Sequence, residues 1–183
     1  MDASRSVLLI DGYNVIAPVA PPGSLADSIW LHRERERLLQ RLREHLPEKV
    51  RQLTFVIFDA ANPPLDSEDQ YTALGVNIRF AVGYPEADDL IEELIAACAT
   101  PKRLAVVSSD HRLQVSAKRR SATVFDSEAW LEQLVSGRVG LAPGVFERLA
   151  GTYQDNFEQG KDTDSLLPSP NEVDAWLKEF DLE

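Results

Sequence analysis

Short, unbroken runs of apolar residues alternate along the chain with longer stretches in which apolar residues recur every three or four positions. The short runs predict five strands, at residues 6–10, 53–58, 76–82, 104–107 and 122–125, of which the first is fully buried. The periodic stretches predict helices at residues 27–46, 85–99, 111–118, 128–135 and 143–149. Strands that alternate with helices favour an α/β fold, in which a mostly parallel central sheet is covered by helices on both faces.

The chain of 183 residues has room for one domain with an appendage. We assign residues 1–150 to the domain and residues 151–183 to an acidic C-terminal linker with a short amphipathic helix at residues 171–180. Apolar side chains would share one face of that helix: Val173, Trp176, Leu177 and Phe180. This helix would either dock on the domain or serve a partner as a tethered acidic peptide.

The net charge of −11 argues against an avid nucleic-acid binder, which normally carries a basic surface. However, residues 152–183 hold −7 of that charge, so the remaining body is only mildly acidic. The bases of the body cluster at residues 33–43 and 118–120. Such clusters are either solvated helix faces or contacts for a phosphate backbone, and charge alone leaves both open.

One cysteine, Cys98, excludes an internal disulfide and a cysteine-based zinc site. Its position on the apolar stripe of a predicted helix indicates core packing. Low cysteine usage favours a reducing cytoplasm. No apolar run approaches the ~18 residues that a membrane span needs, so we expect no membrane association.

Aspartates follow the predicted strands at three places, since Asp11, Asp59 and Asp110 end the first, second and fourth strands. Asp88 lies in the first turn of the helix after the third strand. The carboxyl ends of parallel strands meet at one edge of a sheet, so we expect these four side chains to lie close together. Divalent Mg²⁺ or Mn²⁺ would relieve their repulsion, and a carboxylate-held metal can promote phosphodiester hydrolysis. Each aspartate taken singly is also a common turn or helix-cap residue.

Other polar residues near these aspartates are candidates for the same site. Asn14, three residues after Asp11, could orient a water or the scissile phosphate through its amide. Ser109 beside Asp110 could bond a carboxylate that supports the metal ligands from outside. Of two adjacent aspartates we expect Asp88, rather than Asp89, to point inward. The candidate RNA contacts are Tyr13, Arg35, Arg37, Ser109, Lys118, Arg119 and Arg120.

The segment Val7-Leu8-Leu9-Ile10-Asp11-Gly12-Tyr13-Asn14-Val15-Ile16 resembles the opening of NYN-domain proteins, a branch of the PIN-like nuclease superfamily. The YacP-like endoribonuclease subfamily is the most similar, and residues 55–59, 86–92 and 106–110 resemble it in the same order. The resemblance covers residues 5–135, while the loop at residues 60–64 and the tail beyond residue 150 do not match.

This resemblance implies a PIN-like three-layer α/β/α sandwich, dependence on Mg²⁺ or Mn²⁺, and hydrolysis of RNA. It gives metal or catalytic roles to Asp11, Asp59, Asp88 and Asp110, with Asn14 nearby. Some NYN relatives act in RNA decay or with ribosomes and RNA-processing proteins, so these are candidate partners besides the RNA.

The sequence is therefore compatible with three functions. The first is a metal-dependent endoribonuclease. The second is a doubly wound Mg²⁺-dependent phosphatase or phosphotransfer domain, although Asp126 follows the last strand where that chemistry wants a lysine. The third is a non-catalytic RNA-binding or adaptor protein on the same fold. The sequence does not choose between one metal and two, and it does not give the oligomeric state.

Overall fold

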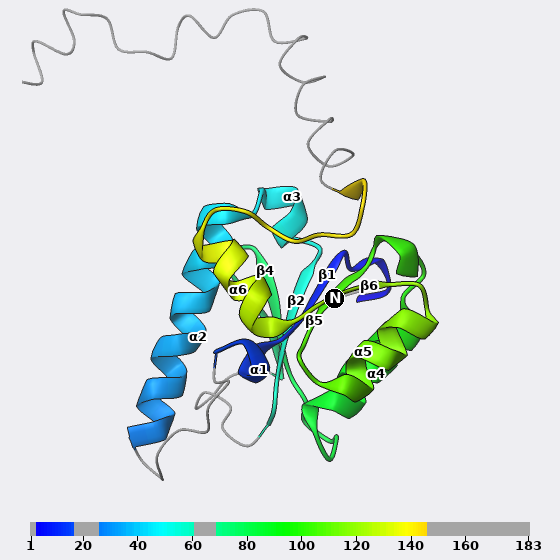
Figure 1. The fold of residues 1–183 in the computed structure, drawn as a ribbon. Helices are drawn as coiled ribbons and strands as arrows, with labels where there is room; N and C mark the ends of the chain where they lie inside the picture. Colours follow the sequence, from blue (N-terminus) through cyan, green and yellow to red (C-terminus); the bar gives the residue numbers. More distant parts are fainter. Residues whose placement is uncertain (1–2, 17–25, 61–68, 146–183) are drawn as a thin grey trace, which may run out of the picture. The chain divides into compact units, whose positions relative to one another are not determined.

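The computed structural model describes residues 3–16, 26–60 and 69–145 (Figure 1). The chain divides into two units, Met1–Leu149 and Ala150–Glu183. The second unit lies outside the described residues, and with it the predicted linker and the predicted helix at residues 171–180. The unmatched loop at residues 60–64 and the predicted helix at residues 143–149 lie largely outside them as well.

A six-stranded sheet forms the centre of the first unit, with the strand order β3-β4-β2-β1-β5-β6. Its strands are β1 (Leu8–Asp11), β2 (Thr54–Phe58), β3 (Gln70–Ala73), β4 (Val76–Phe80), β5 (Ala105–Val107) and β6 (Thr123–Phe125). All neighbouring strands run parallel except β3, which pairs antiparallel with β4 at one edge. The five predicted strands are confirmed, and β3 was missed because its half-buried sequence lacks an apolar run.

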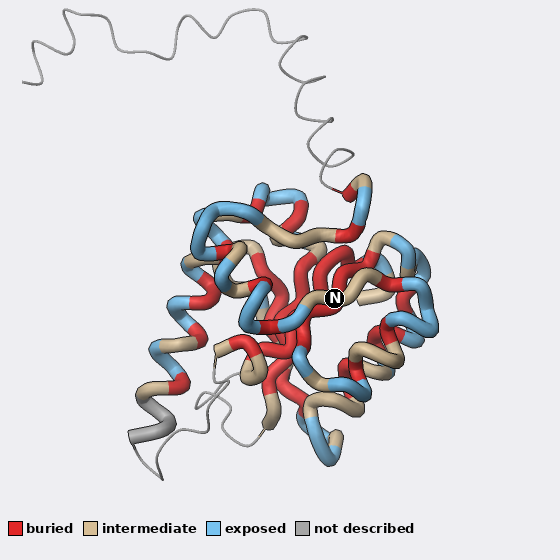
Figure 2. Tube along the Cα trace, in the orientation of Figure 1, coloured by how far each residue is buried: buried red, intermediate tan, exposed pale blue. Residues whose placement is uncertain are grey.

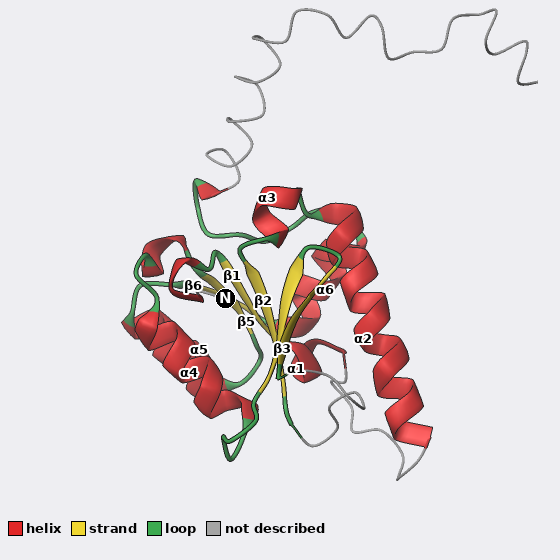
Figure 3. Cartoon of the chain, turned by 180° about the vertical axis from the view of Figure 1, so that it is seen from behind, coloured by secondary structure: helices red, strands yellow, loops and turns green. Residues whose placement is uncertain are grey.

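Helices cover both faces of this sheet (Figures 1 and 3). They are α1 (Gly12–Ile16), α2 (Ala26–His45), α3 (Glu48–Arg51), α4 (Ala87–Ala97), α5 (His111–Arg119) and α6 (Ser127–Val135), with two 3₁₀ turns, η1 (Ala3–Arg5) and η2 (Pro101–Arg103). The helices α1, α2, α3 and α6 pack on one face, and α4 and α5 pack on the other. The predicted α/β/α layering is therefore confirmed. No helix in the described part of the chain is both long and apolar enough to cross a membrane.

The alternation of side chains along each strand builds two separate cores. Buried residues concentrate along the central strands (Figure 2). On β1, Leu8 and Ile10 pack with α2 and α6, whereas Leu9 points to the opposite face and packs with α4 and α5. Every residue of β1 is buried. A strand covered on both faces is therefore apolar throughout until it reaches Asp11.

Gly12 follows the last residue of β1 and begins α1, and it lies directly against the ring of Phe58. A Cβ atom at this position would lie 2.2 Å from Cε1 of Phe58, much closer than carbon atoms can approach. Phe58 is itself buried and packs against Tyr13 and Phe80, with ring centroids 5.0 and 5.7 Å away. The absence of a side chain at residue 12 thus lets α1 sit close to the sheet, which fixes where Asn14 lies.

Replacing Gly12 by alanine should lower the free energy of unfolding by about 1–3 kcal/mol, because the new methyl group overpacks the core against Phe58. Chemical denaturation measures the loss. In a double-mutant cycle with Phe58→Leu, the combined cost should be clearly smaller than the sum of the two single costs, since the smaller side chain makes room for the methyl group. Additive costs would show that Phe58 is not the obstacle.

Candidate functional site

The candidate site lies at the carboxyl edge of the sheet, where β1 ends between β2 and β5. The chain builds β2, β4 and β3 on one side of β1, and then β5 and β6 on the other. The strand order therefore reverses at β1, and ligands of open α/β sheets bind at the carboxyl ends of the strands beside such a reversal.

Asp11 is the buried carboxylate at this reversal, with a relative exposure of 8%. Its Oδ2 accepts a hydrogen bond of 2.9 Å from the hydroxyl of Ser108, and its Oδ1 accepts one of 3.3 Å from the backbone N–H of Asn14. Burial, with smaller contributions from the charges of Asp88 and Asp110, nevertheless raises the pKa of Asp11 to about 6. Ionisation of Asp11 in the folded protein therefore costs free energy.

Asp88 and Asp110 share this electrostatic environment with Asp11. Burial, followed by the charge of Asp110, raises the pKa of Asp88 above its ordinary value. Asp110 caps α5, since its Oδ1 accepts backbone hydrogen bonds from Arg112 and Leu113 at 2.7 and 3.1 Å. We call Asp11, Asp88 and Asp110 the carboxylate group. They come from a strand end, a helix start and a helix cap that lie far apart in the sequence.

The fourth predicted aspartate, Asp59, is not part of this coupled set. It follows β2, and its charge acts on Tyr13, whose pKa is raised mainly by burial. It is absent from the groups that shift Asp11. The structure therefore brings three of the four predicted carboxylates into one electrostatic environment and leaves Asp59 beside it.

The donor chemistry of the carboxylate group suits a hard divalent cation. Within the described residues, no set of three or more His, Cys, Asp or Glu side chains stands close enough together to hold a metal ion by itself. Mg²⁺ commonly binds through one or two carboxylates and keeps several waters, so a complete protein cage is not required. The oxygen donors, together with the raised pKa of Asp11, fit a cation of this type.

The side-chain amide of Asn14 is fixed by two donors. Its Oδ1 accepts 2.9 Å from the backbone N–H of Ser109 and 2.6 Å from the hydroxyl of Ser127. A backbone N–H can only donate, so the oxygen rather than the nitrogen of the amide must face Ser109. The Nδ2 group of Asn14, which has no partner among the described residues, is consequently left as a free donor at this edge.

The two serines after β5 bond different carboxylates. Ser108, which is fully buried, bonds Asp11 and also accepts 3.1 Å from the N–H of Asp110. Ser109 instead donates 2.5 Å to Asp126, and Asp126 caps α6. Ser109 thus bonds a carboxylate outside the carboxylate group, as expected, whereas the bond from Ser108 to Asp11 was not predicted because the sequence of two serines does not tell which of them points inward.

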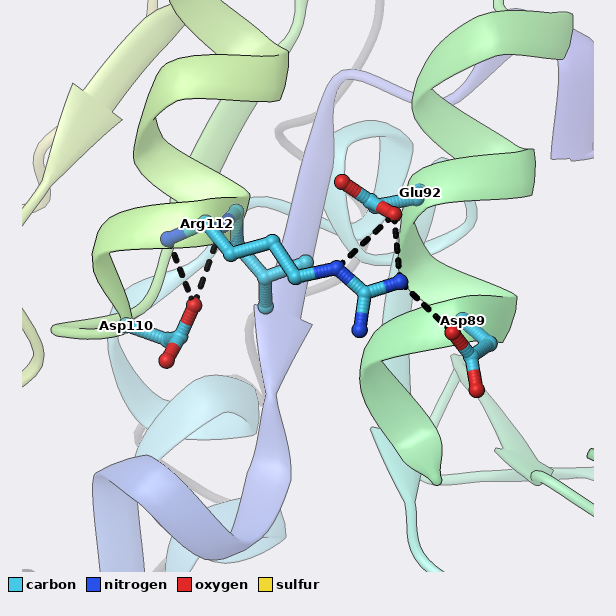
Figure 4. Close-up of polar contacts among 5 residues, drawn as sticks. Asp89, Glu92, Asp110 and Arg112 are labelled. Carbon is cyan, nitrogen blue, oxygen red and sulfur yellow. Dashed lines mark hydrogen bonds and ion pairs between the residues drawn. The ribbon is translucent and has the colours of Figure 1, made fainter. Parts of the chain in front are cut away.

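Arg112 joins the two helices that carry Asp88 and Asp110 (Figure 4). Its Nη2 lies 2.6 Å from Asp89 and 2.7 Å from Glu92, and its Nε donates 3.0 Å to Glu92. This pairing occupies Asp89, which agrees with the expectation that Asp88 is the inward residue of the two. Sequence analysis missed Arg112 because nothing in the spacing of α4 and α5 indicates a pair that bridges them.

Two of the predicted RNA contacts are instead used for packing. Arg35 is buried, and its guanidinium lies over the rings of Phe58 and Phe80, 5.8 and 5.6 Å from their centroids. The ring of Tyr13 is half-buried against Phe58, and its hydroxyl is buried without a hydrogen bond to any described residue. Direct contact of Arg35 with an RNA backbone is thus not supported, and Tyr13 presents little ring surface to a base.

The remaining predicted contacts are exposed but do not gather at the carboxylates. Arg37 pairs with Glu34 and lines an open cavity of about 670 Å³ between α2 and the β3–β4 turn. Lys118, Arg119 and Arg120 lie at the C-terminal end of α5, whereas Asp110 caps its other end. Helix α5 therefore carries these three bases to the opposite edge of the sheet, so that any contact they make with RNA lies away from the carboxylate group.

Comparisons with known proteins give the family and the fold that the chain resembles. The family described as YacP-like NYN domain matches residues 8–144, which include the whole carboxylate group. A crystal structure of Rae1 (YacP) from Bacillus subtilis is similar, with 25% sequence identity, a TM-score of 0.54 and coverage of 99% of this chain and 93% of that chain. A mutant of the same protein gives 23% identity, a TM-score of 0.49 and 87% coverage of both chains. No curated protein sequence matches the chain.

In metal-free buffer, Asp11 should destabilise the fold increasingly as the pH rises from about 4 to about 7. The carboxyl group ionises near 3.8 in the unfolded chain and near 6 in the fold, so the fold is favoured while the group is protonated and loses that advantage as pH rises. Asp11→Asn should therefore gain stability relative to the unchanged protein over this range, by up to about 3 kcal/mol. Denaturant unfolding in EDTA at each pH measures this difference.

Asp126→Asn is the matched control, since hydrogen bonds from Ser109 and the α6 backbone lower the pKa of Asp126. Its effect should be constant between pH 5 and 7 and should change only as the pH falls toward the unfolded value. Adding Mn²⁺ at pH 7 should stabilise the unchanged protein more than Asp11→Asn. A stability difference for Asp11→Asn that does not vary with pH would contradict the raised pKa.

Proposed function

The chain belongs to the YacP-like NYN domain family, and on this premise we propose that it is an endoribonuclease that hydrolyses RNA phosphodiester bonds with Mg²⁺ or Mn²⁺. Membership of this family carries a nuclease-like, RNA-related function. It favours phosphodiester hydrolysis over a phosphatase or phosphotransfer reaction. The specific reaction, the metal and the residues are our proposal.

One observation carries this proposal: the carboxylate group concentrates negative charge around the buried Asp11. Its pKa of about 6 means that ionised Asp11 lacks compensation from the protein alone. A divalent cation would supply that compensation, with oxygens of Asp11, Asp88 and Asp110 as its ligands and Asp59 as a further candidate. The chemistry that such a cation supplies is activation of water and stabilisation of the leaving oxygen of a phosphodiester.

The chain's own residues would bind and orient the substrate. Asn14 offers its Nδ2 as a donor to a phosphate oxygen, because its Oδ1 is already held by Ser109 and Ser127. Ser108 holds Asp11 in one rotamer through its hydroxyl. Arg37 is an exposed candidate for a contact with the RNA backbone.

The setting and partners of this reaction are also proposals. A buried, free Cys98 without a disulfide suits a reducing compartment such as the cytoplasm. Ribosomes or RNA-processing proteins are candidate partners from the family resemblance, and RNA is the substrate.

The test compares two adjacent aspartates that have different partners: Asp110 acts on Asp88, whereas Asp89 pairs with Arg112. Asp88→Asn should lower kcat for cleavage of a structured RNA by about 100-fold or more, because it removes a carboxylate that faces the reacting phosphate. Asp89→Asn should change kcat only a few-fold, since Asp89 pairs with Arg112 rather than with the carboxylate group. Gel assays with Mg²⁺, Mn²⁺ or EDTA measure both, and EDTA should abolish cleavage.

The result also separates the proposed nuclease from a non-catalytic RNA-binding protein. Binding of RNA without cleavage in either metal would favour the binding protein. Equal activity of Asp88→Asn and the unchanged protein would remove the carboxylate group from the reaction. Circular dichroism of both variants checks that any loss of activity is not a loss of folding.

A further inference from the structure

A cluster of basic residues lies at the edge of the sheet where β1, β5 and β6 begin, opposite the carboxylate group. Three segments meet there: Ser4 accepts 2.8 Å from the N–H of Ala99, and Arg120 donates 3.0 Å to the carbonyl of Cys98. We call the cluster the amino-edge basic patch, and its members are Arg5, Lys102, Arg103, Lys118, Arg119 and Arg120. All except the half-buried Arg103 are exposed.

The patch is positive in a chain whose net charge is −11. Residues 3–5, 98–104 and 117–122, which build it, contain six bases and no Asp or Glu. None of the six forms an ion pair with another described residue. Lys118 and Arg119 could be explained by the negative end of the α5 dipole, but Arg5 and Lys102 lie outside that helix. Local helix capping therefore does not account for the patch.

The patch is separated from the carboxylate group by the length of α5. Nine residues at ~1.5 Å each place Lys118 and Arg119 about 13 Å from the end that Asp110 caps. That distance corresponds to about four steps of ~3.4 Å along a nucleic-acid duplex. A ligand that touches both places must therefore extend several nucleotides beyond the bond that is cleaved.

We propose that the amino-edge basic patch binds the phosphate backbone of RNA that flanks the cleavage point, as a second contact remote from the reacting bond. This inference rests on the proposed endoribonuclease function. Arginine and lysine bind phosphate oxygens, and clustered bases without acidic neighbours have that footprint. An acidic protein partner is less favoured, since stable protein interfaces need buried apolar anchors. The exposed large hydrophobic residues of the described chain, Val82 and Val135, both lie outside the patch.

The test removes three exposed bases of the patch in one variant, Lys102→Gln/Lys118→Gln/Arg119→Gln. Arg120 is kept because it bonds the backbone of Cys98. For a structured RNA of about 30 nucleotides, KM should rise about 10-fold or more while kcat is unchanged, and the slope of log affinity against log salt should fall by about 2. An oligonucleotide of about three nucleotides, which leaves one or two on either side of the cut, is too short to reach the patch and should be cleaved equally well by both proteins.

The matched control, Arg43→Gln/Lys49→Gln/Arg138→Gln, removes the same charge from exposed positions outside the patch. It should leave KM and the salt slope nearly unchanged. Equal effects of the two variants on the long RNA would overturn the proposal, since net charge rather than the patch would then govern binding. A loss of kcat on the short RNA would overturn it too.

Binding of the long RNA, measured by fluorescence anisotropy in EDTA, separates this inference from the proposed function. Selective loss of binding in the patch variant supports the patch even where the unchanged protein cleaves nothing. Cleavage by the unchanged protein with identical binding of both variants leaves the nuclease function intact and rejects the patch.

Discussion

The central constraint in this fold is the burial of a carboxylate at the end of a strand that is otherwise wholly apolar. β1 is covered by helices on both faces, so Asp11 ends a run of side chains that water cannot reach. Two hydrogen bonds, from Ser108 and from the backbone of Asn14, only partly offset the cost of removing its charge from water. The carboxylates contributed by α4 and α5 add to that cost. Uncompensated charge of this kind lowers the stability of the fold, and the two cores on either side of the sheet must offset that loss.

The polar groups around Asp11 act as one network, because each of them has more than one partner. Ser108 connects Asp11 to the first turn of α5, and Asn14 connects α1 to Ser109 and to the start of α6. The ends of β1, β5 and β6 are thereby fixed to one another through side chains as well as through the sheet. Arg112 does the same for α4 and α5 at the surface, where an ion pair contributes little to stability but restricts relative movement of the two helices. Positions that supply chemistry are thus supported from several directions.

Periodicity was sufficient to predict the layers, since five strands, of which β6 is only half-buried, and the helices α2, α4, α5 and α6 each carry an apolar pattern. Periodicity did not identify a charged side chain that is buried or a strand that is polar. Arg35 shares the α2 face of Leu31, Leu38 and Leu42, so its spacing already indicated an inward position that its charge concealed. β3 is polar because it lies at the sheet edge, and its sequence has no apolar pattern that predicts a strand. In the candidate site, the aspartates at strand ends were visible from the sequence, but the choice between Ser108 and Ser109, and the bridge made by Arg112, depend on tertiary geometry that no local pattern encodes.

The hydrogen bond between Ser127 and Asn14 joins residues 113 positions apart, so a growing chain can make it only after residue 127 has been added. β1 is synthesised first but lies in the middle of the sheet, with β5 on one side arriving only after some ninety more residues. During synthesis, the N-terminal strand must therefore wait unpaired on that side, with an apolar edge open to other strands. The amide of Asn14 acquires its final orientation only when α6 has emerged. The hydrogen-bond network around Asp11 is thus completed late in synthesis. A nascent chain that is interrupted before residue 127 carries the aspartates but lacks the hydrogen bond that orients the amide of Asn14.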